Sequence, residues 1–466
     1  MNIFQAIRIS NSTCVALTGA GGKTTALIQL AREMSLRAEP VLVTATTHLH
    51  LDQIKLGDLH WVAEKRGDLA DFEKDLRGVI LVTGPVEGDR TIGVNPEVIS
   101  WLREVQIRHN LPLLIEADGA RRKPLKAPAE YEPVIPDFVE MVLVVAGLTG
   151  LGKPLTNEFV HRPEIYARLS GLYPGEMITP EAIARVLVHP AGGIKNIPVG
   201  ARRVALLNQA DTPELQAQAK RIAEQLLPGY HAVIATSLNP SPSLPNQQAF
   251  IHAVYEPVAG IILAGGGSTR FGQTKQLLDW QGKPFVRAVV ETALHSGLAP
   301  VVVVTGAHAE SVENALNDLE VITFRNPNWQ SGQSTSIQSG LRALSQAIPG
   351  DNSLDDKGST CGWEKVGAAI FLLADQPQIT STILHALTEE HARTLSPVVA
   401  PLVRGQRANP VLFDRITFPD LMALSGDVGG RAIFSKVPVN YLNWLDESLL
   451  SDVDTAEDFR KLVNGE

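Results

Sequence analysis

The chain has 466 residues, of which 44% are hydrophobic and 20% are charged. This length predicts two or three domains, and this composition excludes a disordered chain. The formal net charge of −9 argues against a basic nucleic-acid-binding surface, so we expect no nucleic-acid partner, although a local cluster of cations can still hold a phosphate.

The cysteines and the N-terminal residues indicate the compartment. The chain has only two cysteines, Cys14 and Cys361, too few for a disulfide framework or a cysteine-based zinc site. Residues 1–10 lack the basic stretch and apolar core of a signal peptide. The longest apolar runs, such as 141–148, are much shorter than the ~20 residues of a membrane helix. We therefore expect a cytoplasmic protein with no membrane partner.

Strand-like and helical segments alternate along most of the chain, which predicts an α/β fold with mostly parallel sheets. In the N-terminal part, apolar runs predict strands at 14–17, 40–44, 79–82, 111–116, 141–146 and 203–207. In the C-terminal part, they predict strands at 260–264, 299–304, 320–323, 368–373, 397–401 and 410–413. Each part opens with a strand, a glycine-rich turn and a helix, so we expect two tandem domains that bind nucleotides.

Two irregular stretches interrupt this pattern. Residues 237–245 are rich in proline and serine, which cannot continue a helix or a central strand. We place the domain boundary just after them and predict a P-loop-like domain at 1–250 and a Rossmann-like domain at 257–466. The second stretch, 349–362, is expected to be a mobile surface loop.

A phosphate-binding loop is predicted at Thr18–Thr25, which reads TGAGGKTT. It follows a strand and opens a helix, the context in which backbone N–H groups bind a phosphate. Gly21 and Gly22 form the cradle, Lys23 reaches the phosphate, and the Thr24 hydroxyl is a magnesium ligand. The longer form of the motif needs glycine at position 17, where this chain has leucine. The alternative is a purely structural glycine turn.

Charged residues follow the strand at 111–116. Glu116 and Asp118 come at its end, where one of them can bind magnesium or orient a water, and Asp118 is our candidate metal ligand. Four cations lie between positions 121 and 126 and predict an anion clamp, for which a solvated basic loop is the alternative. The candidate anion-binding residues are Arg121, Arg122 and Lys123.

Two further polar segments of this domain follow strands. Thr44–His48 is a candidate sensor of a terminal phosphate, although a polar turn fits equally well. Asn208–Asp211 reads Asn-Gln-Ala-Asp and resembles the Asn-Lys-x-Asp motif with which some P-loop proteins read a base. Gln209 replaces the lysine, which weakens any inference about guanine.

The strongest motif of the C-terminal domain is LAGGGSTRFGQTKQLL at 263–278. Its glycines let the backbone approach a triphosphate. Arg270 and Lys275 supply charge that stabilises a phosphorus centre under attack and the departing pyrophosphate. A glycine turn with two surface cations is the alternative. The nucleotide-binding candidates here are Leu263, Ala264, Gly265, Gly266 and Gly267.

Two aspartates are candidate magnesium ligands. The apolar run at 368–373 leads to Asp375, which is therefore expected at the carboxyl edge of the sheet. Magnesium prefers such carboxylate oxygens together with phosphate oxygens and water. Asp454, in the segment DVDTAED, offers a second carboxylate. The alternatives are a turn for Asp375 and a helix capping box for Asp454.

Three polar segments complete the predicted site. Residues 326–340 are dense in amide and hydroxyl groups and are expected to bind a base or ribose, with Gly332 and Ser334 as candidates. Arg407–Phe413 and Ser425–Arg431 are expected on the acceptor side. Each is equally consistent with a polar loop or a helix N-cap.

The C-terminal half resembles the molybdenum cofactor cytidylyltransferase family in the strings LAGGGSTRFGQTKQLL, FLLADQP, NPVLF, SGDVGGR and DVDTAEDF. The resemblance implies transfer of CMP from CTP to molybdopterin with release of pyrophosphate and use of Mg²⁺. It implies that Gly265–Gly267, Arg270 and Lys275 bind the triphosphate and Asp375 the metal. Gly265 and Ala408 depart from the usual pattern, the first towards the guanylyltransferase sister group, so GTP stays open as the nucleotide.

The N-terminal half resembles the YqeC family in the strings TGAGGKTT, EADGARRKPLKAPAEYEPVIP, GKPLTNEFVHRPE and LNQAD. This resemblance implies a context, selenium-linked maturation of molybdenum hydroxylases, more than a reaction. We therefore expect a two-domain enzyme of molybdenum cofactor maturation that acts on small molecules. The alternatives are a guanylyltransferase, a sugar-phosphate nucleotidyltransferase, or a cofactor chaperone that docks on a molybdenum hydroxylase apoenzyme.

Overall fold

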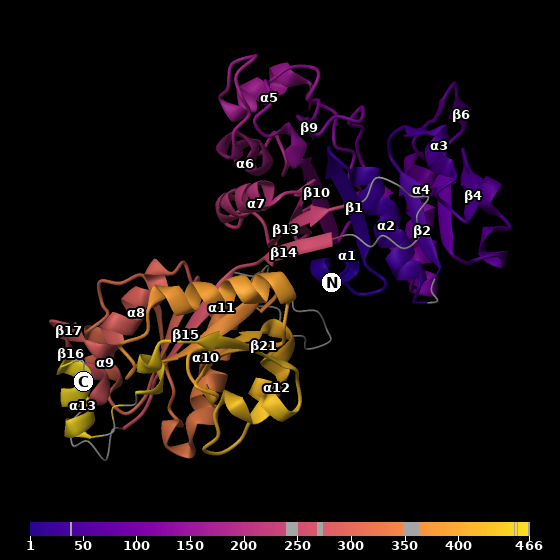
Figure 1. Cartoon of the computed structure of the whole chain (residues 1–466). Coiled ribbons are helices and arrows are strands. Elements are labelled where there is room, and N and C mark those ends of the chain that lie inside the picture. Colours follow the sequence, from indigo (N-terminus) through magenta and orange to yellow (C-terminus); the bar gives the residue numbers. More distant parts are fainter. Residues whose placement is uncertain are drawn as a thin grey trace. The chain divides into compact units, whose positions relative to one another are not determined.

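The computed structural model describes residues 1–37, 40–238, 250–267, 274–347, 363–451, 453 and 455–464. The chain divides into two compact units, Met1–Tyr255 and Glu256–Glu466 (Figure 1). The stretch predicted to be a mobile loop, 349–362, lies outside the described residues, as does most of the proline- and serine-rich stretch.

The first unit is built on a nine-stranded sheet in the order β14-β13-β12-β10-β1-β8-β2-β5-β4. Its strands are β1 (Cys14–Gly19), β2 (Val41–Ala45), β4 (Leu59–Val62), β5 (Val79–Thr83), β8 (Leu113–Glu116), β10 (Met141–Gly147), β12 (Arg202–Asn208), β13 (Ala232–Ser237) and β14 (Phe250–Tyr255). Every pairing is parallel except that of β14 with β13. The segment expected to lead into the second domain thus supplies the edge strand of the first.

Helices and short ribbons surround this sheet. The helices are α1 (Ile3–Ile7), α2 (Lys23–Ser35), α3 (Leu51–Ile54), α4 (Pro96–His109), α5 (Pro163–Ser170), α6 (Pro180–Val188) and α7 (Pro213–Leu226). The ribbons are β3 (Leu49–His50), β6 (Val86–Glu87), β7 (Arg90–Thr91), β9 (Leu125–Lys126) and β11 (Val160–His161). The side chains of Asn95, Thr179 and Thr212 cap α4, α6 and α7, and each of these helices has proline in its first turn.

The inner strands are buried on both faces, as expected for a parallel sheet covered by helices. Cys14, at the start of the central strand β1, is fully buried. Burial raises the pKa of its thiol to about 12, so this cysteine stays protonated in the folded unit.

The second unit has an eight-stranded sheet in the order β19-β18-β15-β20-β23-β21-β22, with β24 also paired to β21. Its strands are β15 (Val258–Ala264), β18 (Val301–Thr305), β19 (Ile322–Arg325), β20 (Ala368–Leu373), β21 (Val398–Val403), β22 (Gln406–Arg407), β23 (Val411–Asp414) and β24 (Val439–Trp444). The first four of these run parallel, whereas β23 lies antiparallel between β20 and β21. The prediction of an α/β fold with mostly parallel sheets is confirmed.

Helices cover both faces of this second sheet (Figure 1). They are α8 (Phe285–His295), α9 (Ala309–Asn314), α10 (Gln333–Ala347), α11 (Ser381–Thr394), α12 (Phe418–Met422) and α13 (Ala456–Asn464). Successive residues of β15 point to opposite faces, so Ile262 packs with α8 and α11, while Ile261 packs with α10 and α12. In neither unit is any described helix long and apolar enough to cross a lipid bilayer.

Candidate functional site

The predicted phosphate-binding loop lies between β1 and α2 and depends on three glycines. Gly19, Gly21 and Gly22 have φ values of +94°, +81° and +126°, a region that residues with a Cβ rarely adopt. A Cβ on Gly19 would lie 2.1 Å from the backbone oxygen of Val145. A Cβ on Gly22 would lie 2.3 Å from Nδ2 of Asn208. Gly19 and Gly22 therefore have no room for a side chain, because β10 and β12 approach the loop closely.

The side chains that follow this loop point into the end of the sheet. Lys23 Nζ donates to the backbone oxygen of Gly19 at 2.7 Å and lies 3.1 Å from Asp118 Oδ1. Thr24 Oγ1 donates to Glu116 Oε2 at 3.0 Å and accepts from Gln53 Nε2 at 2.8 Å. Of the two acidic residues after β8, Glu116 thus lies beside the threonine hydroxyl and Asp118 beside the lysine.

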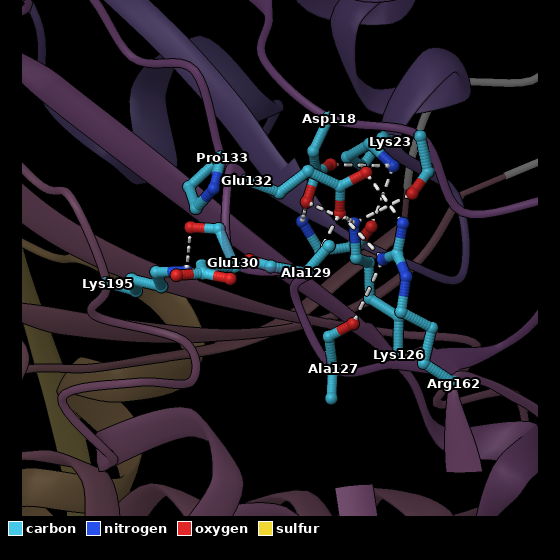
Figure 2. A network of polar contacts seen from close by, with 12 residues as sticks. Lys23, Asp118, Lys126, Ala127, Ala129, Glu130, Glu132, Pro133, Arg162 and Lys195 are labelled. Carbon is cyan, nitrogen blue, oxygen red and sulfur yellow. Dashed lines mark hydrogen bonds and ion pairs between the residues drawn. The ribbon is translucent and has the colours of Figure 1, made fainter. Parts of the chain in front are cut away.

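A chain of alternating charges continues from Asp118 (Figure 2). Lys126 Nζ lies 2.7 Å from Asp118 Oδ2 and 2.8 Å from Glu132 Oε2. Arg162 binds Glu132 through two nitrogens at 2.7 and 2.9 Å. The side chains of Lys23, Asp118 and Lys126 are at most 4% exposed. Each of the two carboxylates, Asp118 and Glu132, therefore contacts two cations.

Burial and neighbouring charges shift three pKa values in and beside this cluster. Burial alone would raise the pKa of Glu132, but the hydrogen bonds from Arg162 and the charge of Lys126 lower it to about 2. Burial, together with the charges of Arg162 and Lys126, lowers the pKa of His161 from 6.5 to about 4. Burial raises the pKa of Glu116, against the charge of nearby Lys23.

The lowered pKa of His161 predicts a loss of stability in mild acid. Between pH 6.5 and 4 the unfolded chain binds a proton at this histidine that the folded chain does not, so the free energy of unfolding falls as the pH drops. Urea unfolding at pH 7 and pH 5 measures this difference, which His161→Gln should reduce. Changing the exposed His48 to glutamine is the matched control. An equal pH dependence in wild type and His161→Gln would contradict the prediction.

The predicted anion clamp has an unusual backbone. Arg121 and Arg122 have φ values of +48° and +59° and are exposed, in a turn closed by a bond from the backbone nitrogen of Lys123 to Ala120. The backbone oxygen of Lys123 accepts from the nitrogen of Gly21 at 3.0 Å, so this turn is attached to the phosphate-binding loop. Lys123 Nζ donates to the backbone oxygen of Glu158. Anion binding by these three residues stays a prediction.

Two other predicted polar groups of the first unit bind backbone. Thr44 Oγ1 is buried and donates to the oxygen of Val82, and Thr46 Oγ1 donates to that of Val134. Each hydroxyl would have to leave its backbone partner before it could contact a phosphate. Phosphate sensing by Thr44–His48 stays a prediction.

In the second unit, the glycine turn and Asp375 lie at the same sheet edge. Leu263 in β15 pairs with Leu373 in β20, and the nitrogen of Ala374 donates to the oxygen of Leu263 at 3.2 Å. Gly265–Gly267 leave β15 directly after this pair, and the half-buried Asp375 leaves β20 there. The parallel register thus places the predicted phosphate-binding backbone beside the predicted metal ligand.

The other charged candidates are located less completely. Lys275 opens a short 3₁₀ turn, and the next residue, Gln276, donates to the oxygen of Gly266 at 3.0 Å. This bond attaches the segment of Lys275 to the glycine turn. Arg270 and Asp454 lie outside the described residues. Gln378 donates to the oxygen of Ser451 at 2.8 Å, which fixes the chain shortly before Asp454.

A pocket of about 250 Å³ opens beside this edge. Its wall combines apolar and aromatic side chains from β15, β20 and β23 with three polar groups, Gln333, Asn409 and Arg431. The segments Arg407–Phe413 and Ser425–Arg431 both contribute to the wall. Their place on the acceptor side stays a prediction.

Gly332 and Ser334 hold the loop that forms part of this pocket. Ser334 Oγ donates to the oxygen of Gly426 at 2.6 Å, and the nitrogen of Gln333 donates to Asp427 Oδ1 at 3.1 Å. A Cβ on Gly332 would lie 2.5 Å from the Cα of Asp427. The partners of Gly332 and Ser334 lie in the segment Ser425–Arg431, and contact of these two residues with a nucleotide stays a prediction.

The residues present suit magnesium at both sites. Within the described part of the chain, no three His, Cys, Asp or Glu residues cluster as a complete metal cage. Magnesium is commonly held by one or two carboxylates, with phosphate oxygens and water completing the shell. Asp375 offers such a carboxylate in the second unit, and Glu116 with Thr24 offers a carboxylate and a hydroxyl in the first.

Comparisons with known proteins agree with this division into units. The YqeC protein family matches residues 15–164, and the MobA-like NTP transferase domain matches residues 260–441. The uncharacterized protein YqeC of Escherichia coli is 34% identical over 206 residues, which are 42% of this chain and 76% of that protein.

Two relatives match the second unit. Nicotine blue oxidoreductase of Paenarthrobacter nicotinovorans is 29% identical over 216 residues, 44% of this chain and 96% of that protein. A probable molybdenum cofactor guanylyltransferase of Bacillus cytotoxicus is 35% identical over 89 residues, 19% of this chain and 43% of that protein. The chain therefore belongs to the YqeC protein family through its first unit and carries a MobA-like NTP transferase domain in its second.

Proposed function

We propose that the second unit transfers CMP from CTP to molybdopterin and releases pyrophosphate. The observation that carries this proposal is the shared sheet edge, where the turn Gly265–Gly267 and the carboxylate of Asp375 lie side by side next to a pocket of about 250 Å³. A triphosphate needs a bare backbone and an oxygen ligand for its metal, and an acceptor needs a neighbouring cavity.

The acceptor and the nucleotide are argued from different observations. The relative from Bacillus cytotoxicus is named as a probable molybdenum cofactor guanylyltransferase, which supports a molybdopterin acceptor. The strings KQLL and ADQP resemble those of cytidylyltransferases and favour CTP, whereas Gly265 resembles the guanylyltransferases. GTP is therefore the second candidate nucleotide.

The reaction needs positioning and charge stabilisation, with no covalent enzyme intermediate. An oxygen of the terminal phosphate of the acceptor attacks the α-phosphorus of the NTP and forms a new P–O bond. The bond between the α-phosphorus and the oxygen that bridges the α- and β-phosphates breaks, and pyrophosphate leaves. The backbone of Gly265–Gly267 approaches the phosphates, and Arg270 and Lys275 offset the growing negative charge. Bound Mg²⁺, held by Asp375 with Asp454 as the proposed second ligand, would neutralise charge on the triphosphate.

For the first unit we propose that Thr18–Thr25 binds a nucleoside triphosphate. Lys23 would exchange Asp118 for a phosphate, and Thr24 would bind Mg²⁺ together with Glu116, which lies 3.0 Å from its hydroxyl. We therefore propose Glu116 as the metal ligand. Asp118, the ligand predicted from the sequence, contacts Lys23 and Lys126 and would keep its contact with Lys126. The nucleotide would act in a linked step of cofactor maturation, with a molybdenum hydroxylase apoenzyme as the recipient.

The full chain incubated with molybdopterin, Mg²⁺ and one NTP at a time tests the transferase. We expect pyrophosphate release that depends on molybdopterin and a product whose mass equals that of molybdopterin plus CMP. A GMP adduct would replace the proposed nucleotide and keep the acceptor. Absence of any nucleotide adduct would contradict the proposal.

A further inference from the structure

The side chain of Asn208 joins three segments at the carboxyl edge of the first sheet. Its Nδ2 donates to the oxygen of Gly21 in the phosphate-binding loop at 2.7 Å. Its Oδ1 accepts from the nitrogen of Leu238, the residue that follows β13, at 2.9 Å. Asn208 itself ends β12 and is 2% exposed. One buried carboxamide therefore fixes the ends of β12 and β13 to the loop expected to hold phosphates.

The sheet order determines where the base of a bound nucleotide can lie. β10, β12 and β13 follow one another on one side of β1, all parallel, whereas β8 with Glu116 lies on its other side. Ligands of such sheets lie along the carboxyl edge. With phosphates on the loop after β1 and a metal towards Glu116, the base extends towards the ends of β12 and β13.

The loop after β12 presents an acceptor at that position. Gln209 has a φ of +65°, and its Oε1 accepts from Thr149 Oγ1 at 2.6 Å, which holds the loop against the end of β10. The nitrogen of Ala210 donates to the oxygen of Thr236 in β13 at 3.0 Å. The next residue, Asp211, is exposed. A carboxylate thus follows a loop that a side-chain bond holds to the 3₁₀ turn after β10 and a backbone bond holds to β13.

The chemistry of a carboxylate selects among the bases. An ionised carboxylate only accepts hydrogen bonds, through two oxygens side by side. Guanine presents two adjacent donors, N1–H and the 2-amino group, whereas adenine and cytosine pair one amino donor with a ring acceptor and uracil flanks its single N–H with two carbonyl oxygens. We infer that the nucleotide of the first unit is a guanine nucleotide and that Asp211 accepts both of these hydrogen bonds.

This inference rests on the proposed nucleotide binding by Thr18–Thr25, and it has a sharp test. Equilibrium dialysis of the full chain with Mg²⁺ and labelled GTP, ATP or XTP measures binding, and Lys23→Met identifies the part that belongs to the first unit. Xanthine carries an oxygen where guanine has its 2-amino group, so the amide of Asp211→Asn matches it as one donor and one acceptor. Glu214→Gln removes a charge from an exposed position three residues away and is the matched control.

We expect the Lys23-dependent binding to prefer GTP over ATP. Asp211→Asn should weaken GTP binding by about 100-fold, the order expected for two charge-assisted hydrogen bonds, and strengthen XTP binding. Glu214→Gln should leave both unchanged. Equal Lys23-dependent binding of ATP and GTP, or unchanged preference in Asp211→Asn, would overturn the guanine assignment and leave the nucleotide site standing. If no nucleotide shows Lys23-dependent binding, the proposed site and the inference both fail.

Discussion

Asp375→Ala is expected to lower NTP-dependent pyrophosphate release by about 1,000-fold or more, because a metal at a transferring phosphoryl group supplies several kcal/mol of charge stabilisation. Asp375 is the described carboxylate beside the glycine turn, at the end of the strand paired with β15. The substitution removes the proposed oxygen ligand from the half-buried edge, and it lies after the last residue of β20.

The measurement is steady-state pyrophosphate release with molybdopterin and each NTP, together with a thermal unfolding curve. The midpoint of unfolding should be unchanged within a few degrees, so that lost activity reports on chemistry. Glu320→Ala removes an exposed carboxylate of the same unit and should retain wild-type turnover. Turnover by Asp375→Ala within tenfold of wild type would remove the metal assignment.

Lys126→Met is expected to lower the free energy of unfolding of the first unit by about 3–5 kcal/mol, the usual cost of removing one partner from a buried ion pair. Lys126 is 2% exposed at its side chain and lies between Asp118 and Glu132. Methionine fills a similar volume, but both carboxylates then lose a buried cation and depend on Lys23 and Arg162 alone.

Pulse proteolysis across a urea series measures this change. Lys55→Met, at an exposed position of the same unit, should alter stability by less than about 0.5 kcal/mol. A Lys126→Met protein as stable as wild type would show that the charges of this cluster are compensated by other means.

The strands that the sequence predicts correctly are those buried on both faces. Their continuous apolar runs, as in β1, β5, β10 and β20, are distinctive because helices cover both sides of a parallel sheet. Three strands of the nine-stranded sheet were missed, and so were β22 and β24 of the eight-stranded sheet. At one edge of the nine-stranded sheet β4 alternates half-buried and exposed residues, and at the other edge β14 is only partly buried. β13 is largely buried, and it lies directly before the proline-rich stretch, whose composition predicts a linker.

In the sites, too, residues placed by their own strand could be predicted, whereas residues whose partners come from other segments could not. The glycine turn and Asp375 were expected to meet, because parallel strands end at one edge. The role of Lys126 could not be predicted in this way. Within the basic run it looks like one more solvent-facing cation, and its burial depends on Glu132 and Arg162, which other segments supply. Likewise, Ser334 looked free to bind a ligand because its partner at Gly426 lies 92 positions away in the sequence.

The buried thiol of Cys14 offers a way to measure how fast the first unit opens. The thiolate form of a cysteine is the form that attacks an alkylating reagent. In the folded sheet, Cys14 is both inaccessible and held protonated. In a Cys361→Ser background, and with enough reagent that labelling is faster than reclosing, the rate at which an alkylating reagent labels the chain therefore equals the rate at which the centre of the nine-stranded sheet opens. Adding a nucleotide that occupies the adjoining loop should slow that labelling, so occupancy could be followed by mass without any assay of turnover.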